Sequence, residues 1–211
     1  MAGHLPLSSR PMTDIPLLLD PLFLAQTATI LAVPGPTNAL LATAGATKGI
    51  RVSIRFVAVV LTAYLGAILA WGLLLIPASA AWPPLMVLAR LGCALFLAAT
   101  ALRLWRGTTS LAATPASPIT NRTLTLATLL NPKALLFATG IFPATAFTQS
   151  DVFYSTALAF AAPLVPITLA WIAFGASLAS SQSRISPKLA HRAAAILLAC
   201  FSASIGLSAV V

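Results

Sequence analysis

The feature that most constrains the fold of this chain is a series of apolar segments, each long enough to cross a membrane. A helix of about 20 apolar residues spans the roughly 30 Å hydrocarbon core of a bilayer. The 211-residue sequence is 59% hydrophobic and 7% charged, whereas soluble domains carry about 25% charged residues. Such a chain cannot cover itself with a water-exposed surface. It is expected to cross the membrane in segments near residues 22–43, 52–76, 85–104, 124–147, 152–179 and 193–211.

These segments predict an all-α membrane protein, because lipid offers backbone groups no partner outside a helix. One stretch rich in Ser, Thr, Pro and Ala, residues 106–122, separates three spans from three spans. We predict a first repeat over 1–105, with a short outer segment at 1–20, then a cytoplasmic linker over 106–122 and a second repeat over 123–211. NALLATAG at 38–45 resembles KALLFATG at 133–140, a weak internal match that supports a duplication. With three spans in each half, the second repeat is expected to be inverted.

The basic residues predict the orientation, since Lys and Arg collect in cytoplasmic loops. All of the twelve Lys and Arg except Arg10 and Arg90 fall on one side of this topology, and all three acids fall on the other. We therefore expect a bacterial inner membrane protein with both termini outside. The net charge of +9 reflects these loops, and no nucleic-acid partner is expected. The basic residues on the cytoplasmic side are Lys48, Arg51, Arg55, Arg103, Arg106, Arg122, Lys133, Arg184, Lys188 and Arg192.

The first span is interrupted by PGPTN at residues 34–38. A proline in a helix interior removes a backbone donor and costs about 3 kcal/mol. Pro34 and Pro36 are expected to break the span and to leave the carbonyls of Ile30 and Ala32 without helical partners. These carbonyls would attract a cation.

Beyond Gly35, the amides of Thr37, Asn38 and Ala39 begin a new half-helix. The N-terminus of a helix carries a partial positive charge and binds anions. Together with the freed carbonyls, it predicts a site for a zwitterion, to which Thr37 and Asn38 add side-chain hydrogen bonds.

Asn131-Pro132-Lys133 repeats this device in the fourth span, where Pro132 frees the carbonyl of Thr128. Interrupted helices at matching positions of two inverted repeats are typical of secondary transporters and mark the binding site. The plainer alternative is that the prolines only kink helices for packing.

Lys133 has two interpretations. If the fourth span begins at Leu124, the lysine lies about 13 Å deep and is a candidate to bind a substrate carboxylate. If the span begins near Leu129, the side chain reaches the inner interface, and we favour this second interpretation.

The remaining polar and aromatic residues suggest packing. Cys93 and Cys200 stand alone in apolar runs and are expected to be small core residues; without a CxxC pattern, neither a redox nor a metal framework is indicated. Trp82 and Trp105 are expected at the membrane interface. Core packing is the preferred interpretation of Tyr64, Trp71, Trp171, Pro163 and Pro166.

Three segments resemble the LysE/RhtB family of bacterial amino-acid exporters: AVPGPTNALLATAGATKGIR, LARLGCALFLAATALRLWRG and LLNPKALLFATGIFP. The resemblance covers nearly the whole chain in order and span count. It implies a proton-driven exporter of amino acids such as homoserine, threonine, lysine or leucine. The positions that it implies are functional are Pro34, Gly35, Pro36, Asn38, Asn131, Pro132 and Lys133.

We predict a secondary transporter that exports amino acids or related metabolites by alternating access, with no enzymatic activity and no cofactor. Its expected partners are the substrate and the lipid bilayer, and a homo-oligomer is left open. Two alternatives remain. A membrane thiol-disulfide reductant carrier can share this architecture but places a cysteine beside each proline break. A non-transporting assembly subunit predicts no buried polar groups at the breaks.

Overall fold

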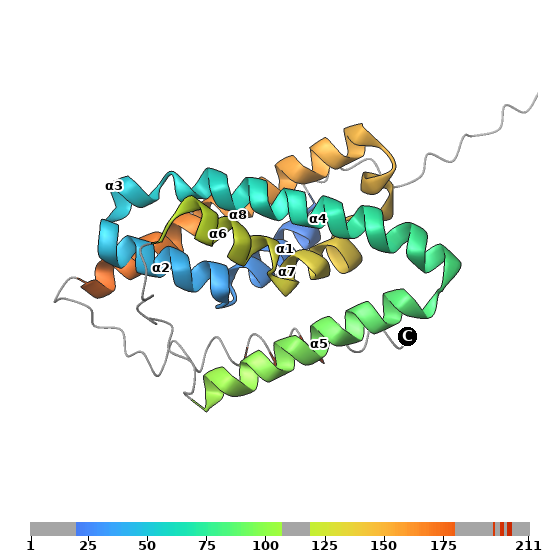
Figure 1. Ribbon diagram of the computed structural model, residues 1–211, viewed down its shortest axis with the longest axis horizontal. Helices are drawn as coiled ribbons and strands as arrows, with labels where there is room; N and C mark the ends of the chain where they lie inside the picture. The colour runs from blue at the N-terminus through green and yellow to red at the C-terminus, as the bar shows by residue number, and fades with distance from the viewer. Residues whose placement is uncertain (1–19, 107–118, 180–195, 197–198, 201, 204–211) are drawn as a thin grey trace, which may run out of the picture.

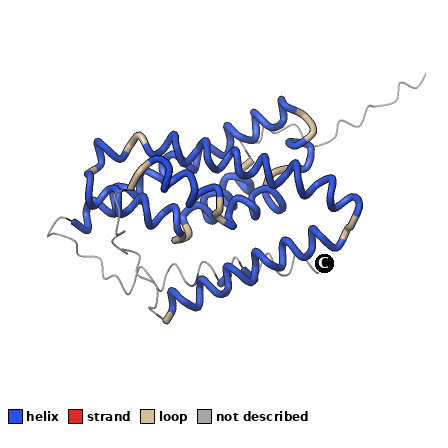
Figure 2. The backbone as a smooth tube through the Cα atoms, viewed as in Figure 1, coloured by secondary structure: helices blue, strands red, loops and turns tan. Residues whose placement is uncertain are grey.

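The computed structural model describes residues 20–106 and 119–179, together with 196, 199–200 and 202–203 near the C-terminal end. Every regular element in these ranges is helical (Figures 1 and 2). The side chains at 90, 97, 100, 103 and 104 are not described. The outer segment before residue 20, most of the predicted linker and most of the predicted sixth span lie outside the described residues.

The first predicted span is two helices, α1 (Pro21–Ala32) and α2 (Pro36–Lys48), as the prolines indicate. Asp20 caps α1 by accepting a hydrogen bond of 2.9 Å from the amide of Leu22. A proline at the first position of each helix suits a site where an amide would have no helical partner. The predicted break in the first span is therefore confirmed.

A short helix, α3 (Ile50–Ser53), leads into α4 (Phe56–Ala81), and α5 (Pro84–Trp105) follows after a tight turn. Gly49, with φ of 76°, adopts the left-handed conformation between α2 and α3, which glycine adopts without steric cost. α5 begins at Pro84, where a proline suits the first helical position. In Figure 1, α5 runs along the edge of the bundle.

The second half begins with α6 (Asn121–Leu129) and α7 (Pro132–Leu136). A π-helical turn, η2 (Phe137–Ile141), and a 3₁₀ turn, η3 (Ala144–Phe147), lead into α8 (Ser150–Ala179). The direction changes by 44° between residues 121–129 and 132–141. The predicted break in the fourth span is confirmed. Pro163 and Pro166 leave α8 one helix over its full length.

Two helical stretches of the described residues, 50–81 and 150–179, are long and apolar enough to cross a membrane, and the bent pair from 121 to 141 makes a third. The stretches 21–32 and 84–96 are apolar but shorter. The first five predicted spans thus fall on helices, with the first and fourth each divided at a break.

The main packing contacts cross between the two halves of the chain. The helix α2 packs on α8, and α4 packs on α6. The α2–α8 contact is backbone against backbone: a Cβ on Gly45 would lie 1.9 Å from the Ile172 carbonyl oxygen, and one on Gly175 would lie 1.7 Å from that of Ala42. Small residues allow this close approach in membrane helix pairs.

Two of the packing expectations have different outcomes. Cys93 is buried, as expected, but Cys200 is exposed, so its predicted core position is wrong. Beside it, Ser202 donates a hydrogen bond of 2.8 Å to the carbonyl of Ala94 on α5. Ile196, Ala199, Ser202 and Ala203 line a shared hollow with α5, so Cys200 lies off the contact face.

Candidate functional site

The first helix break is held open by Asn38. The chain is extended at Val33 (ψ of 131°) and at Gly35 (φ of −169°, ψ of −179°), and this stretch separates α1 from α2. The side-chain Nδ2 of Asn38 donates to the carbonyl of Leu31 at 2.7 Å and to that of Val33 at 2.8 Å. The polar side chain therefore satisfies carbonyls that the break leaves without helical partners.

These bonds correct the sequence interpretation, which named the carbonyls of Ile30 and Ala32. Proline removes the donors that those two would have paired with, but the extended backbone at Val33 releases the next carbonyls as well. The acceptors used at the site are those of Leu31 and Val33.

The second break is capped by its own asparagine. Asn131 is the N-cap of α7, and its Oδ1 accepts from the amide of Lys133 at 3.1 Å. Pro132 occupies the first helical position. The Nδ2 atom of Asn131 is left to donate elsewhere, and both of its bonds leave α7.

Those bonds join the two breaks. Asn131 Nδ2 donates to Thr37 Oγ1 and to the Tyr64 hydroxyl, each at 3.0 Å. Thr37 Oγ1 lies 3.2 Å from Thr128 Oγ1, which donates to the carbonyl of Leu124 at 2.8 Å. Because a hydroxyl has one hydrogen, Thr37 must donate to Thr128. The chain of donors runs from Asn131 through Thr37 and Thr128 to Leu124.

Lys133 is buried, with 3% of its surface exposed. Its ammonium donates to the carbonyl of Val33, the acceptor that Asn38 also uses. The favoured expectation that this lysine reaches the inner interface is therefore wrong. α6 begins at Asn121, so Lys133 lies more than two turns into the bent segment, and the break in the other half supplies its acceptor.

No ion pair with Lys133 is found among the described residues. The acids of those segments are Asp20, at the start of α1, and Asp151, in the first turn of α8. A buried ammonium without a carboxylate is costly in a membrane, which makes Lys133 a candidate functional residue.

The predicted site residues come together, with different roles. Thr37, Asn38, Asn131 and Lys133 are the buried polar members. Gly35 borders the lysine: a Cβ there would lie 3.5 Å from Lys133 Cε, an ordinary contact. Pro34 is buried, Pro132 is half-buried and Pro36 is exposed. The three prolines shape the backbone, whereas the polar side chains form the network.

The sequence interpretation expected a free carbonyl at Thr128, and this was wrong, because that carbonyl accepts from the amide of Asn131 at 3.1 Å. The Thr128 hydroxyl, which joins the network, was not named.

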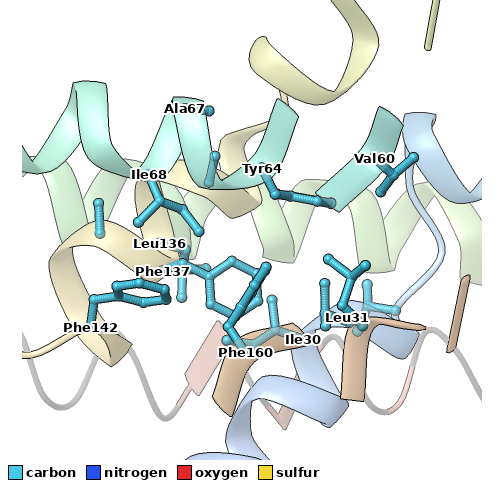
Figure 3. Close-up of a cluster of buried hydrophobic side chains, with 14 of the residues drawn as sticks. Ile30, Leu31, Val60, Tyr64, Ala67, Ile68, Leu136, Phe137, Phe142 and Phe160 are labelled. Carbon is cyan, nitrogen blue, oxygen red and sulfur yellow. The ribbon is translucent and has the colours of Figure 1, made fainter. Parts of the chain in front are cut away.

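The sequence interpretation also missed Tyr64. Its hydroxyl accepts from Asn131, while its ring stands edge-on to Phe137 and Phe160 at centroid distances of 6.2 and 6.0 Å. Figure 3 shows Tyr64 on α4 in the same buried cluster as Phe137, Phe160, Ile30 and Leu31. A tyrosine inside an apolar span was the available signal, because a buried hydroxyl usually has a partner.

Apolar helices that enclose two facing breaks and a buried, polar, partly charged network define a multi-pass membrane protein of transporter type. The LysE type translocator family model matches residues 28–211, which include every residue of this site. The chain belongs to the LysE type translocator family, a family of membrane transporters of small molecules. Searches of the curated proteins and of the solved structures gave no match.

Proposed function

We propose that this protein exports amino acids, or closely related small metabolites, across the bacterial inner membrane by alternating access. The observation that carries the proposal is the meeting of two helix breaks from opposite halves of the chain around Lys133 and Asn38. Unwound backbone at membrane depth is tolerated where it is enclosed by protein or lines a cavity. Paired breaks of this kind form the substrate sites of secondary transporters.

The site offers complementary groups to a zwitterion. At the start of α2, the amide of Ala39 donates to the Gly35 carbonyl. The amides of Thr37 and Asn38, which precede it, have no acceptor within the helix. They favour a carboxylate. The carbonyls of Leu31 and Val33 favour an ammonium group. An amino acid presents both charges on one carbon and fits across the break.

The proposal includes six spans in two inverted three-span repeats. The packing supports it: the broken segment of the first half, α1–α2, lies against α8, and that of the second half, α6–α7, lies against α4. These are equivalent pairs if α1–α2 corresponds to α6–α7 and α4 to α8. The order of the elements on each side of the predicted linker supports the same correspondence.

The proposed driving force is the proton gradient, with both termini outside. One charge that crosses the membrane is worth about 2.3 kcal/mol per 100 mV, which is roughly a fiftyfold concentration ratio. One proton per substrate is therefore sufficient for export.

The rival thiol-disulfide carrier needs a cysteine at each break. The breaks hold Asn38 and Asn131, while Cys93 lies on α5 and Cys200 near the C-terminal end. The buried polar network weighs against an assembly subunit, which has no need of one.

Efflux from reconstituted vesicles tests the proposal. Vesicles loaded in turn with radiolabelled threonine, homoserine, leucine and lysine are given a proton gradient, and release is compared with that from protein-free vesicles. We expect gradient-dependent release of at least one. If these four and every other amino acid tried in the same way are released at the protein-free rate, amino-acid export is rejected.

A further inference from the structure

The carbonyl of Val33 is an acceptor that donors from both halves of the chain share. A carbonyl oxygen has two lone pairs, and both are used here, one by Asn38 Nδ2 and one by the ammonium of Lys133. A substrate ammonium can reach this oxygen only by displacing a donor. Asn38 is anchored a second time, on Leu31, whereas Val33 is the acceptor found for Lys133. The lysine is therefore the donor that can leave.

The group that leaves and the group that arrives are chemically the same. Lys133 presents a primary ammonium with three hydrogens to a carbonyl at a helix break, as the amino group of an amino acid would. Gly35 borders the end of the lysine without overlap, so the ammonium lies directly beside the unwound backbone. The occupied acceptor thus resembles an amine site filled by the protein itself.

We infer that Lys133 is an internal substitute for the substrate ammonium and that their mutual exclusion couples transport to protons. This inference rests on the proposed function. When the substrate ammonium bonds to the carbonyl of Val33 from the cytoplasmic side, Lys133 is displaced. Two buried ammonium groups side by side are unfavourable, so Lys133 releases one proton to cytoplasmic water and becomes a neutral amine.

The return step restores the starting state. After the substrate leaves on the outer side, the neutral amine of Lys133 takes one proton from outer water, and its ammonium returns to Val33. Each cycle moves one substrate out and one proton in. This exchange has the direction that a proton-driven exporter requires.

The surroundings of Lys133 offer few other proton carriers. The elements with the main contacts to α7 are α4, α5 and η2, and Lys133 itself meets the α1–α2 break at Val33 and Gly35. In these, α4 contributes Tyr64, α5 contributes Cys93, and η2 contributes no titratable residue. Arg90 and Arg103 also belong to α5, and their side chains lie outside the description.

Binding and proton release, measured together on purified protein, test this inference. The probes are radiolabelled threonine and leucine, and the variants are Lys133→Met and the control Lys48→Met. Lys48 also donates to a backbone carbonyl, that of Ile119, but lies at the end of α2 away from the breaks. A second variant, Lys133→Gln, serves if the methionine variant does not fold.

We expect the wild type and Lys48→Met to release one proton for each substrate bound. Their affinity should rise by up to about tenfold per pH unit from about pH 6 to about pH 8, because binding that releases one proton is favoured as protons become scarce. Lys133→Met should bind at least as tightly, release no proton and show no such pH dependence. In vesicles it should exchange substrate without driven efflux.

Other results reject the inference. If Lys133→Met binds tenfold or more weakly while the wild type releases no proton, the lysine is a simple carboxylate ligand, and amino-acid export still stands. If proton release persists in both Lys133 variants, another group carries the proton. If the wild type binds and transports neither probe nor any other amino acid, the proposed function and this inference fall together.

Discussion

Asn38 and Lys133, from opposite halves of the chain, donate to the same backbone carbonyl, that of Val33. They are also the paired first residues of the internal match between 38–45 and 133–140. If the halves arose by duplication, the two equivalent positions have diverged, one to a neutral amide and one to a cation. The carbonyl of Val33 accepts from both side chains, so the two halves contribute different chemical groups to the site.

Asn38→Ala should weaken substrate binding by roughly five- to hundredfold. The loss of its amide leaves the carbonyl of Leu31 without this donor and that of Val33 with Lys133 alone, and a stranded buried polar group costs about 1–3 kcal/mol. The control is Thr43→Ala on the same helix. The Thr43 hydroxyl donates to the carbonyl of Ala39, one turn earlier in α2. Equilibrium binding and thermal unfolding in detergent measure both variants. Equal behaviour of the two would contradict the role given to Asn38.

Tyr64→Phe should reduce transport while leaving the ring packing with Phe137 and Phe160 in place. It removes the acceptor for one hydrogen of Asn131, at a cost of about 1–3 kcal/mol. Tyr154→Phe, at an exposed position on α8, is the matched control and should behave as the wild type.

Asn131→Ala should impair transport in the same way as Asn38→Ala if the halves share one site. Combined with Tyr64→Phe, it should cost less than the sum of the two single changes, because both remove the same hydrogen bond. Strict additivity in this double-mutant cycle would show that the bond between them contributes nothing.

Replacement of Pro34 and Pro36 together by alanine should abolish transport without loss of stability. Alanine restores the amides that a continuous helix needs, and a straightened first span would withdraw the Leu31 and Val33 carbonyls from the site. Circular dichroism and vesicle efflux measure the two effects. Efflux at the wild-type rate would show that the break is only a packing kink.

Gly175→Ala should destabilise the protein by about 1–3 kcal/mol or more, the usual effect of inserting a methyl group into a packed core. Its Cβ would lie 1.7 Å from the carbonyl oxygen of Ala42, and backbone cannot rotate away as a side chain can. Gly66→Ala is the control, since nothing lies within 4 Å of its Cβ. Unfolding temperatures that rank the two variants in the opposite order would exclude close α2–α8 packing.

The topology is tested by cysteines at Ser110 and Ser150 in a protein whose Cys93 and Cys200 are replaced by alanine. We expect an impermeant reagent to label position 150 from outside and position 110 only from inside. The cysteine-free protein should retain transport, as expected if neither thiol takes part. Outside labelling of position 110 would exclude the inverted arrangement proposed above.

The helices and their breaks were predictable because proline acts locally. Pro34, Pro36 and Pro132 remove donors wherever they stand, so the breaks could be placed without knowledge of the fold. The partners were not predictable in this way. Lys133 is deep because a carbonyl 100 residues away accepts its ammonium, and no local pattern reports that distance.

Tyr64 and the true acceptors were missed for related reasons. A tyrosine in an apolar run is compatible with packing alone until its neighbour Asn131 is known. The carbonyls of Leu31 and Val33 are released by the extended backbone at Val33, a consequence of how the chain turns rather than of which residue lacks an amide. The residue types of the site were thus predictable, and its hydrogen-bond partners were not.

The glycine contact between α2 and α8 has a consequence for how the protein can move. Two helices whose backbones touch at Gly45 and Gly175 would collide if they slid past each other, so we expect α2 and α8, from different halves of the chain, to move together. The contact that opens during transport would then lie elsewhere. We expect it between α2 and α6, which are joined by the hydrogen bond between the hydroxyl groups of Thr37 and Thr128. The moving unit would then combine α2 from the first half of the chain with α8 from the second. Paired spin labels should keep a constant distance between α2 and α8 during turnover, while labels on α2 and α6 separate and close.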